Sequence, residues 1–120
     1  MVNIFKELIL MGEKQRKENP AAEQIIIVKT TKDNIYFCVN YNIMQGNYED
    51  EKQFFQMLVD VNDVEVKYIV CMWKNGGVDI PSANFRKNLF AICPKNEEAI
   101  WVGLGEKGLI YKTLKDIHPL

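Results

Sequence analysis

Two segments of this sequence are apolar on consecutive residues rather than on alternate ones. Residues 25–29 form a short continuous apolar run, and residues 66–73 (VKYIVCMW) are the most strand-like stretch of the chain. This composition is typical of strands buried on both faces, because a strand with one solvated face alternates apolar and polar residues. The chain must therefore cover both sides of a central sheet, which predicts a three-layer α/β/α sandwich.

The rest of the chain supplies the helices and strands that such a sandwich needs. A first amphipathic helix begins near Ile4, fades over the polar residues 13–19 and ends at Pro20. Further helices are predicted at residues 49–62 and 81–92, strands at 25–29, 34–41, 66–73, 99–104 and 109–113, and a last helical turn at 114–117. The order α-β-β-α-β-α-β-β, without a repeat or linker, predicts one domain over residues 1–120 with a mixed five-stranded sheet.

Charge and cysteine content exclude several classes of function. The formal net charge is -1 and the sequence pI is about 5.8, whereas nucleic-acid binding needs a basic surface. The chain lacks an apolar run of the ~20 residues that a membrane span requires, and Lys6 and Glu7 interrupt its beginning, unlike a signal peptide. Cys38, Cys71 and Cys93 are widely separated, as free thiols are. We therefore expect a cytoplasmic protein without nucleic-acid or membrane partners.

Short motifs along the chain match those of a known family in order and spacing. Residues 32–36 (KDNIY) lead to Asn40-Tyr41-Asn42, and residues 49–51 (EDE) open the second helix. Residues 81–86 (PSANFR) open the third helix, and residues 113–120 (TLKDIHPL) end the chain. These stretches resemble the KDGKIY, Asn-x-Glu, Cys-Ala-Glu, Pro-Cys-x-x-Cys-Arg and TLKELLP stretches of the cytidine deaminases. The resemblance extends from about residue 20 to the end, and it implies the fold of that family.

The zinc ligands of that family are replaced here. The family holds its catalytic zinc ion with one His or Cys at one helix start and two Cys at the next. The resemblance assigns these three positions to Glu49, Ser82 and Phe85. Phenylalanine cannot bind a metal, serine is a poor zinc ligand, and a zinc site needs three or four N, S or carboxylate donors. We therefore expect neither zinc nor another cofactor.

Other positions of the family's site keep polar residues. Glu51 matches the catalytic glutamate, and Asn40 and Asn42 match the residues that contact the ribose. Zinc lowers the pKa of bound water from ~15.7 to ~7, worth roughly 12 kcal/mol, whereas a general base supplies only ~10²- to 10⁴-fold. Glu51 alone therefore should not deaminate cytidine. Acidic residues also favour any helix start, and asparagines commonly form turns.

Arg86 matches the arginine that follows the family's second zinc cysteine. Because guanidinium groups bind carboxylates, we expect Arg86 to pair with Glu49 or Asp50, although a plain surface arginine is an equal alternative. Family members are commonly dimers or tetramers, so the resemblance also implies a homo-oligomer.

Three functions stay open at this point. The first is a non-catalytic relative that binds a nucleoside-like or nucleotide-like small molecule, or that serves as an interaction subunit. The second is an active hydrolase or deaminase-related enzyme of altered chemistry that uses Glu51 as acid and base. The third is a small α/β domain unrelated to the family. An open polar pocket at Asn40, Asn42 and Glu51 would favour ligand binding, and one filled by Phe85 and its neighbours would favour an interaction module.

Overall fold

The structure is a computed structural model that describes residues 2–106 and 108–117. Its helices are α1 (Val2–Glu18), α2 (Glu49–Asp60), α3 (Ala83–Ile92) and α4 (Leu114–Ile117), with 3₁₀ turns η1 (Ile43–Gln45) and η2 (Pro94–Glu98). Its strands are β1 (Gln24–Thr30), β2 (Ile35–Asn40), β3 (Val66–Trp73), β4 (Ile100–Gly105) and β5 (Gly108–Thr113). The predicted element order and the mixed five-stranded sheet are confirmed.

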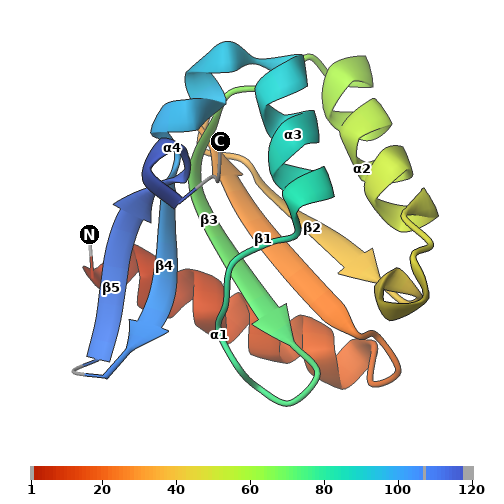
Figure 1. Ribbon diagram of the computed structural model, residues 1–120, viewed down its shortest axis with the longest axis vertical. Helices are drawn as coiled ribbons and strands as arrows, with labels where there is room; N and C mark the ends of the chain where they lie inside the picture. Colours follow the sequence, from red (N-terminus) through yellow and green to blue (C-terminus); the bar gives the residue numbers. More distant parts are fainter. Residues whose placement is uncertain (1, 107, 118–120) are drawn as a thin grey trace.

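The sheet consists of an antiparallel part and a C-terminal hairpin. The strand order is β2-β1-β3-β4-β5, and β1 pairs antiparallel with both β2 and β3 (Figure 1). Strands β4 and β5 form an antiparallel hairpin. This hairpin joins the sheet through the short parallel β3–β4 seam, where Tyr68 lies opposite Ile100 and Ile69 opposite Trp101.

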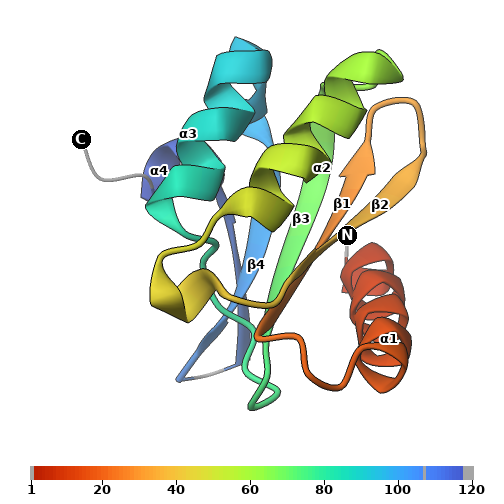
Figure 2. The ribbon, with the colours of Figure 1, turned by 90° about the vertical axis from the view of Figure 1, so that its right-hand side faces the viewer.

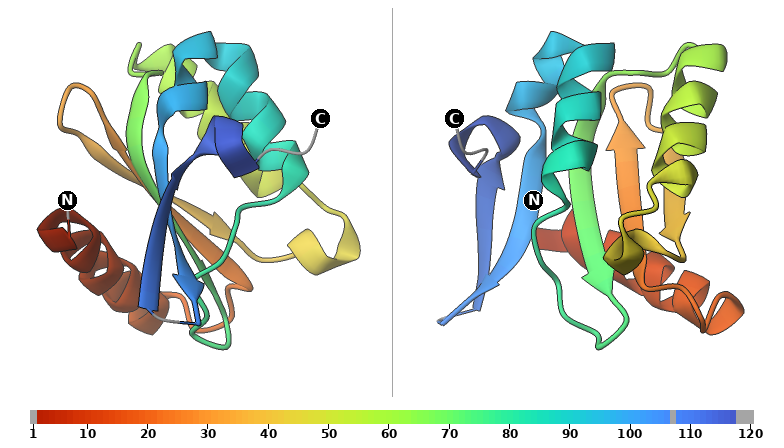
Figure 3. Two further views of the ribbon diagram at one scale, coloured as in Figure 1. Left: turned by 60° about the vertical axis from the view of Figure 1, so that its left-hand side comes forward. Right: turned by 45° about the vertical axis from the view of Figure 1, so that its right-hand side comes forward.

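Helices cover both faces of the sheet. Helix α1 lies on one face, and α2 and α3 lie on the other (Figures 2 and 3). Ile25 and Ile27 pack in the core beneath α1, whereas Ile26 and Val28 pack in the core beneath α2 and α3. The continuous apolar run of β1 is thus explained, since each residue has a core to enter. Full burial of each such side chain contributes about 1.5–3 kcal/mol.

Helix α1 lies close against the sheet at Gly12. A Cβ atom at Gly12 would overlap the ends of the Met72 and Ile27 side chains, so a larger residue would require these side chains to shift. The helix continues through the polar residues where the sequence predicted fading, and Arg16 in its last turns donates a hydrogen bond to the carbonyl of Ala22. Within the described ranges, no helix has both the length and the apolarity needed to cross a membrane.

The first turns of α2 and α3 lie at the same edge of the sheet (Figure 1). Strands β2 and β3 are both antiparallel to β1, so they point the same way and end at the same edge of the sheet, on either side of Gln24 in β1. Each of these strands leads to a helix, through η1 for α2 and through residues 74–82 for α3. Ser82 caps α3 by accepting a hydrogen bond from the backbone N–H of Phe85 at 3.1 Å.

Candidate functional site

Five polar side chains meet where β2 ends and α2 and α3 begin. We call this group the Glu51 cluster: Gln24, Asn40, Glu51, Ser82 and Asn84. The carboxyl group of Glu51 accepts hydrogen bonds from Asn84 Nδ2 at 3.0 Å, Asn40 Nδ2 at 3.3 Å and Ser82 Oγ at 3.4 Å. Asn40 Nδ2 also donates to Gln24 Oε1 at 3.1 Å. Segments far apart in the sequence therefore converge on one carboxyl group.

The Glu51 cluster is closed to solvent at its centre. Glu51 is 0% exposed and Asn40 is 2% exposed. Burial raises the pKa of Glu51, because a carboxylate loses hydration there, and the hydrogen bonds from Asn84, Ser82 and Asn40 offset this only in part. The cluster is thus a bonded polar core rather than an open pocket.

The three positions that match zinc ligands do not form a zinc site. Phe85 is 0% exposed, and its ring centroid lies 4.8 Å from that of Phe55 and 5.9 Å from that of Phe54. The Ser82 hydroxyl is engaged with Glu51 and the Phe85 backbone, and Glu49 is exposed. An apolar ring and an engaged hydroxyl cannot supply the donors of tetrahedral zinc. Among the residues described, no group of three His, Cys, Asp or Glu could hold a metal ion.

The expected ion pair of Arg86 with Glu49 or Asp50 is wrong. Arg86 is 6% exposed, and its Nη1 donates to the carbonyl of Ile117 at 3.0 Å while its Nε donates to the carbonyl of Ser82 at 3.5 Å. Its side chain therefore points toward α4 and not toward α2. Burial lowers the pKa of Arg86. The guanidinium group of Arg86 therefore links α3 to α4 by a hydrogen bond.

Asn42 does not join Asn40. Asn40 ends β2 and points into the cluster, whereas Asn42 is exposed and its backbone carbonyl accepts hydrogen bonds from Gln45 and Asn47. In the described part of the chain its side chain makes no hydrogen bond, so Asn42 acts as a turn former.

Sequence reasoning missed Gln24 and Asn84. Gln24 lies directly opposite Asn40 in the β1–β2 register, and its Nε2 is buried without a hydrogen-bond partner in the described structure. Asn84 follows the cap residue Ser82 in the first turn of α3. Gln24 could have been found from the sequence, because it and Asn40 are polar residues at the paired ends of the two hairpin strands. No comparable signal marks Asn84, because helix starts commonly carry asparagine.

Two thiols border the cluster. Cys38 Sγ donates to Asn40 Oδ1 at 3.5 Å, and Cys38 and Cys71 both lie opposite Ile26 in the neighbouring strands. Burial raises the pKa of both thiols, and the nearby charge of Glu51 raises it further. All three cysteines are free, as predicted; Cys38 and Cys71 are buried, whereas Cys93 is only half-buried. Neutral thiols of this kind are poor nucleophiles and poor metal ligands.

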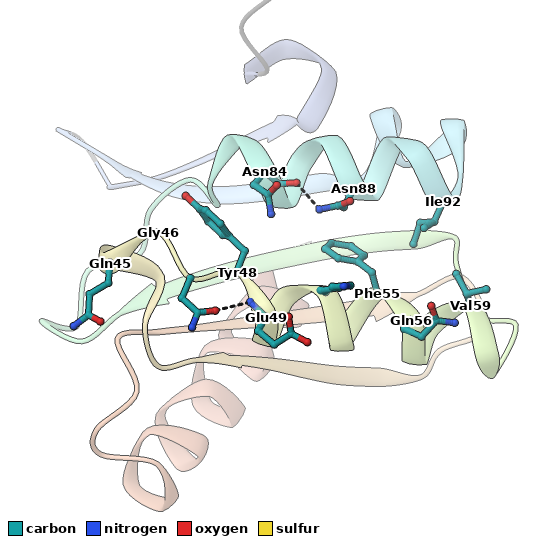
Figure 4. Close-up of a pocket in the computed structure, with 12 residues that line it drawn as sticks. Gln45, Gly46, Tyr48, Glu49, Phe55, Gln56, Val59, Asn84, Asn88 and Ile92 are labelled. Carbon is teal, nitrogen blue, oxygen red and sulfur yellow. Dashed lines mark hydrogen bonds between the residues drawn. The ribbon is translucent and has the colours of Figure 1, made fainter.

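An open groove runs between α2 and α3 beside the closed cluster (Figure 4). Its volume is about 750 Å³. Side chains of both helices and of the preceding loop point toward one another across it, and the walls and floor include Glu49, Lys52, Phe55, Gln56, Val59, Asn84, Asn88 and Ile92. Asn84 belongs to both features, since its Nδ2 bonds Glu51 while the residue lines the groove.

The chain matches no model of a known protein family and no curated protein. Its function must therefore be inferred from the geometry of its own residues. Two features carry that inference: a buried polar cluster around Glu51 and an open groove between α2 and α3.

Proposed function

We propose that this chain is a non-catalytic domain resembling the cytidine deaminases, and that it acts by binding another protein. The closure of the Glu51 cluster carries this proposal. Glu51 and Asn40 are buried and hydrogen-bonded to each other, and the ring of Phe85 packs against the rings of Phe54 and Phe55. A nucleoside has no room at these side chains, so the open surface beside them is the better candidate for binding.

The resemblance draws support from where its motifs meet. Asn40, Glu51 and Ser82 come from three separate motifs, and the resemblance implies that they belong to one site. They are joined by hydrogen bonds of 3.3 and 3.4 Å.

Metal content tests the loss of the family's zinc chemistry. Protein purified without chelators should contain far less than one zinc ion per chain by elemental mass spectrometry, and it should not convert cytidine to uridine. A triple variant should gain about one zinc ion per chain, because it restores three ligands. Its substitutions are Glu49→His, Ser82→Cys and Phe85→Cys. The double variant Glu49→His/Ser82→Cys, which keeps Phe85, is the matched control and should bind little zinc. Stoichiometric zinc in the unaltered protein would contradict the proposal.

One observation favours a second candidate, an enzyme that uses Glu51 as acid and base. The raised pKa of Glu51 is typical of catalytic carboxyl groups. Its full burial argues against this role, because a substrate has to reach the carboxyl group. Hydrolysis or deamination of a nucleoside that is abolished by Glu51→Gln, with folding unchanged, would favour the enzyme over the interaction domain.

We also propose that the chain forms a homo-oligomer, as the resemblance implies. Exposed apolar side chains of the edge strand β5, Leu109 and Ile110, support an interface there. Light scattering at several concentrations should give a mass of two or four times 13.9 kDa. A monomer mass at all concentrations would contradict this part of the proposal.

A further inference from the structure

The walls of the α2–α3 groove present carbonyl oxygens to a ligand. Five carboxamide side chains line the groove: Gln45 and Asn47 in the loop before α2, and Gln56, Asn84 and Asn88 on the two helices. Each of the three on the helices donates one N–H of its NH₂ group within the chain. Gln56 Nε2 donates to Asp60 at 2.9 Å, Asn84 Nδ2 to Glu51 at 3.0 Å, and Asn88 Nδ2 to the Asn84 carbonyl at 3.0 Å. Within the described structure, no hydrogen bond reaches the side-chain oxygens of these three residues, so they are available to N–H donors on a ligand.

The floor of the groove is apolar. Phe55, Val59 and Ile92 lie between the two walls (Figure 4). Val59 is 49% exposed and Ile92 is half-buried. A ligand that covered this floor would remove apolar surface from water, which favours binding. The ligand should therefore offer N–H donors at its sides and apolar groups at its base.

The spacing of the lining residues matches that of an extended peptide. Asn84, Asn88 and Ile92 are four residues apart on α3, and Phe55 and Val59 are four apart on α2. Four residues of a helix advance about 6 Å along its axis. Alternate N–H groups of an extended chain repeat about every 6.6–6.8 Å, as do its side chains on one face. The mismatch per repeat is less than about 1 Å, which flexible carboxamides can absorb.

We propose that the groove binds an extended peptide segment of a partner protein. Main-chain N–H groups of the segment donate to the oxygens of Gln56, Asn84 and Asn88, and its alternate apolar side chains cover the floor. This inference rests on the proposed function and names the class of partner. The charged lining residues Glu49 and Lys52 have opposite signs, so a segment of low net charge fits better than a strongly charged one.

Selection from a random peptide library tests the inference. Displayed peptides of about seven residues are enriched on the unaltered protein and depleted on the Gln56→Leu/Asn88→Leu double variant. Asn84 is left intact because it holds Glu51. Each oxygen removed should weaken binding about fivefold to tenfold. Asn3→Leu on α1, on the opposite face of the sheet, is the control and should bind the selected peptides normally.

Backbone methylation of a selected peptide separates main-chain recognition from simple apolar contact. N-methyl groups at alternate residues should weaken binding about fivefold to tenfold in one register and leave it unchanged in the other. This measurement uses the unaltered protein, so it holds even if the double variant does not fold.

Three outcomes would overturn the inference. One is the absence of enriched peptides after repeated selection, and another is binding that N-methylation leaves unchanged in both registers. The third is a thermal shift with cytidine that the double variant abolishes, which would make the groove a small-molecule site. Zinc-free, inactive protein that selects no peptide would remove the groove inference and leave the non-catalytic assignment intact.

Discussion

Two acidic side chains are buried in the described part of the chain, and they lie at opposite ends of α2. Glu51 is in the first turn of the helix, and Asp63 follows shortly after its last residue. Each accepts hydrogen bonds from three side chains. Their titration differs nonetheless, because the pKa of Glu51 is raised and the pKa of Asp63 is lowered.

Depth of burial, hydrogen-bond length and nearby charge together explain the difference. Burial acts to raise the pKa of Asp63, but short hydrogen bonds to its Oδ2 and the charge of Lys32 outweigh it. These bonds come from Asn34 at 2.9 Å, Tyr36 at 2.8 Å and Thr30 at 3.0 Å. The bonds to Glu51 are 3.0–3.4 Å long, and burial prevails there. The number of donors around a buried carboxyl group therefore does not determine the direction of its pKa shift.

Replacement of Asp63 should have the largest effect on stability. Asp63→Ala leaves the buried Thr30, the half-buried Tyr36 and the exposed Asn34 without their acceptor, and we expect a loss of about 3 kcal/mol in the free energy of unfolding. Urea denaturation at pH 7 measures it. Asp60→Ala is the control, since Asp60 is exposed and should change stability by less than about 0.5 kcal/mol. Equal losses in the two variants would show that the Asp63 contacts carry no special stability.

Tyr36→Phe should weaken the same carboxyl site by one donor. Because the folded pKa of Asp63 is depressed, its stabilisation is present above about pH 3.9 and is lost as the pH falls through the folded pKa. Removal of the phenol brings that pKa closer to its ordinary value. We expect a loss of about 1.5 kcal/mol at pH 7 and an acid-unfolding midpoint at higher pH. An unchanged acid profile by circular dichroism would argue that Tyr36 does not stabilise the carboxylate.

Glu51→Gln should have the smallest effect, with the opposite sign. Because the folded pKa of Glu51 is raised, stability falls as the pH rises from about 4.3 through the folded pKa. Glutamine does not titrate, so the variant should gain about 0.5–1 kcal/mol at pH 8 and lose this advantage below about pH 4. Glu49→Gln, exposed in the same helical turn, should instead cost a few tenths of a kcal/mol. If the Glu51→Gln variant is less stable than the unaltered protein at pH 8, burial of the Glu51 carboxylate does not cost stability, and the contrast with Asp63 fails.

The fold followed from local patterns because those patterns report burial directly. The apolar run of residues 25–29 predicted a strand with a core on each side, and Ile26 and Ile27 do enter different cores. The turns η1 and η2 were not predicted, since 3₁₀ segments this short show no periodicity. The β3–β4 register depends on distant packing that no local pattern encodes.

The candidate site was predictable only in part. Glu51, Asn40 and Ser82 were singled out by a resemblance of motifs, and they do meet. The partner of Arg86 was wrong, because a backbone carbonyl of Ile117 accepts its hydrogen bond and carbonyls carry no signature in a sequence. The free carbonyl oxygens of the groove were missed for a similar reason. They depend on which end of each carboxamide is already bonded.

The short β3–β4 seam has a consequence for how the molecule opens. The antiparallel part and the C-terminal hairpin can behave as two cooperative units, because the backbone pairing between them is brief. Two side-chain hydrogen bonds also link the units. Trp101 Nε1 donates to the carbonyl of Asp79 at 2.8 Å, and Arg86 donates to the carbonyl of Ile117. Amide hydrogens of β4 and β5 should therefore exchange with solvent before those of β1, with the groove between α2 and α3 still intact.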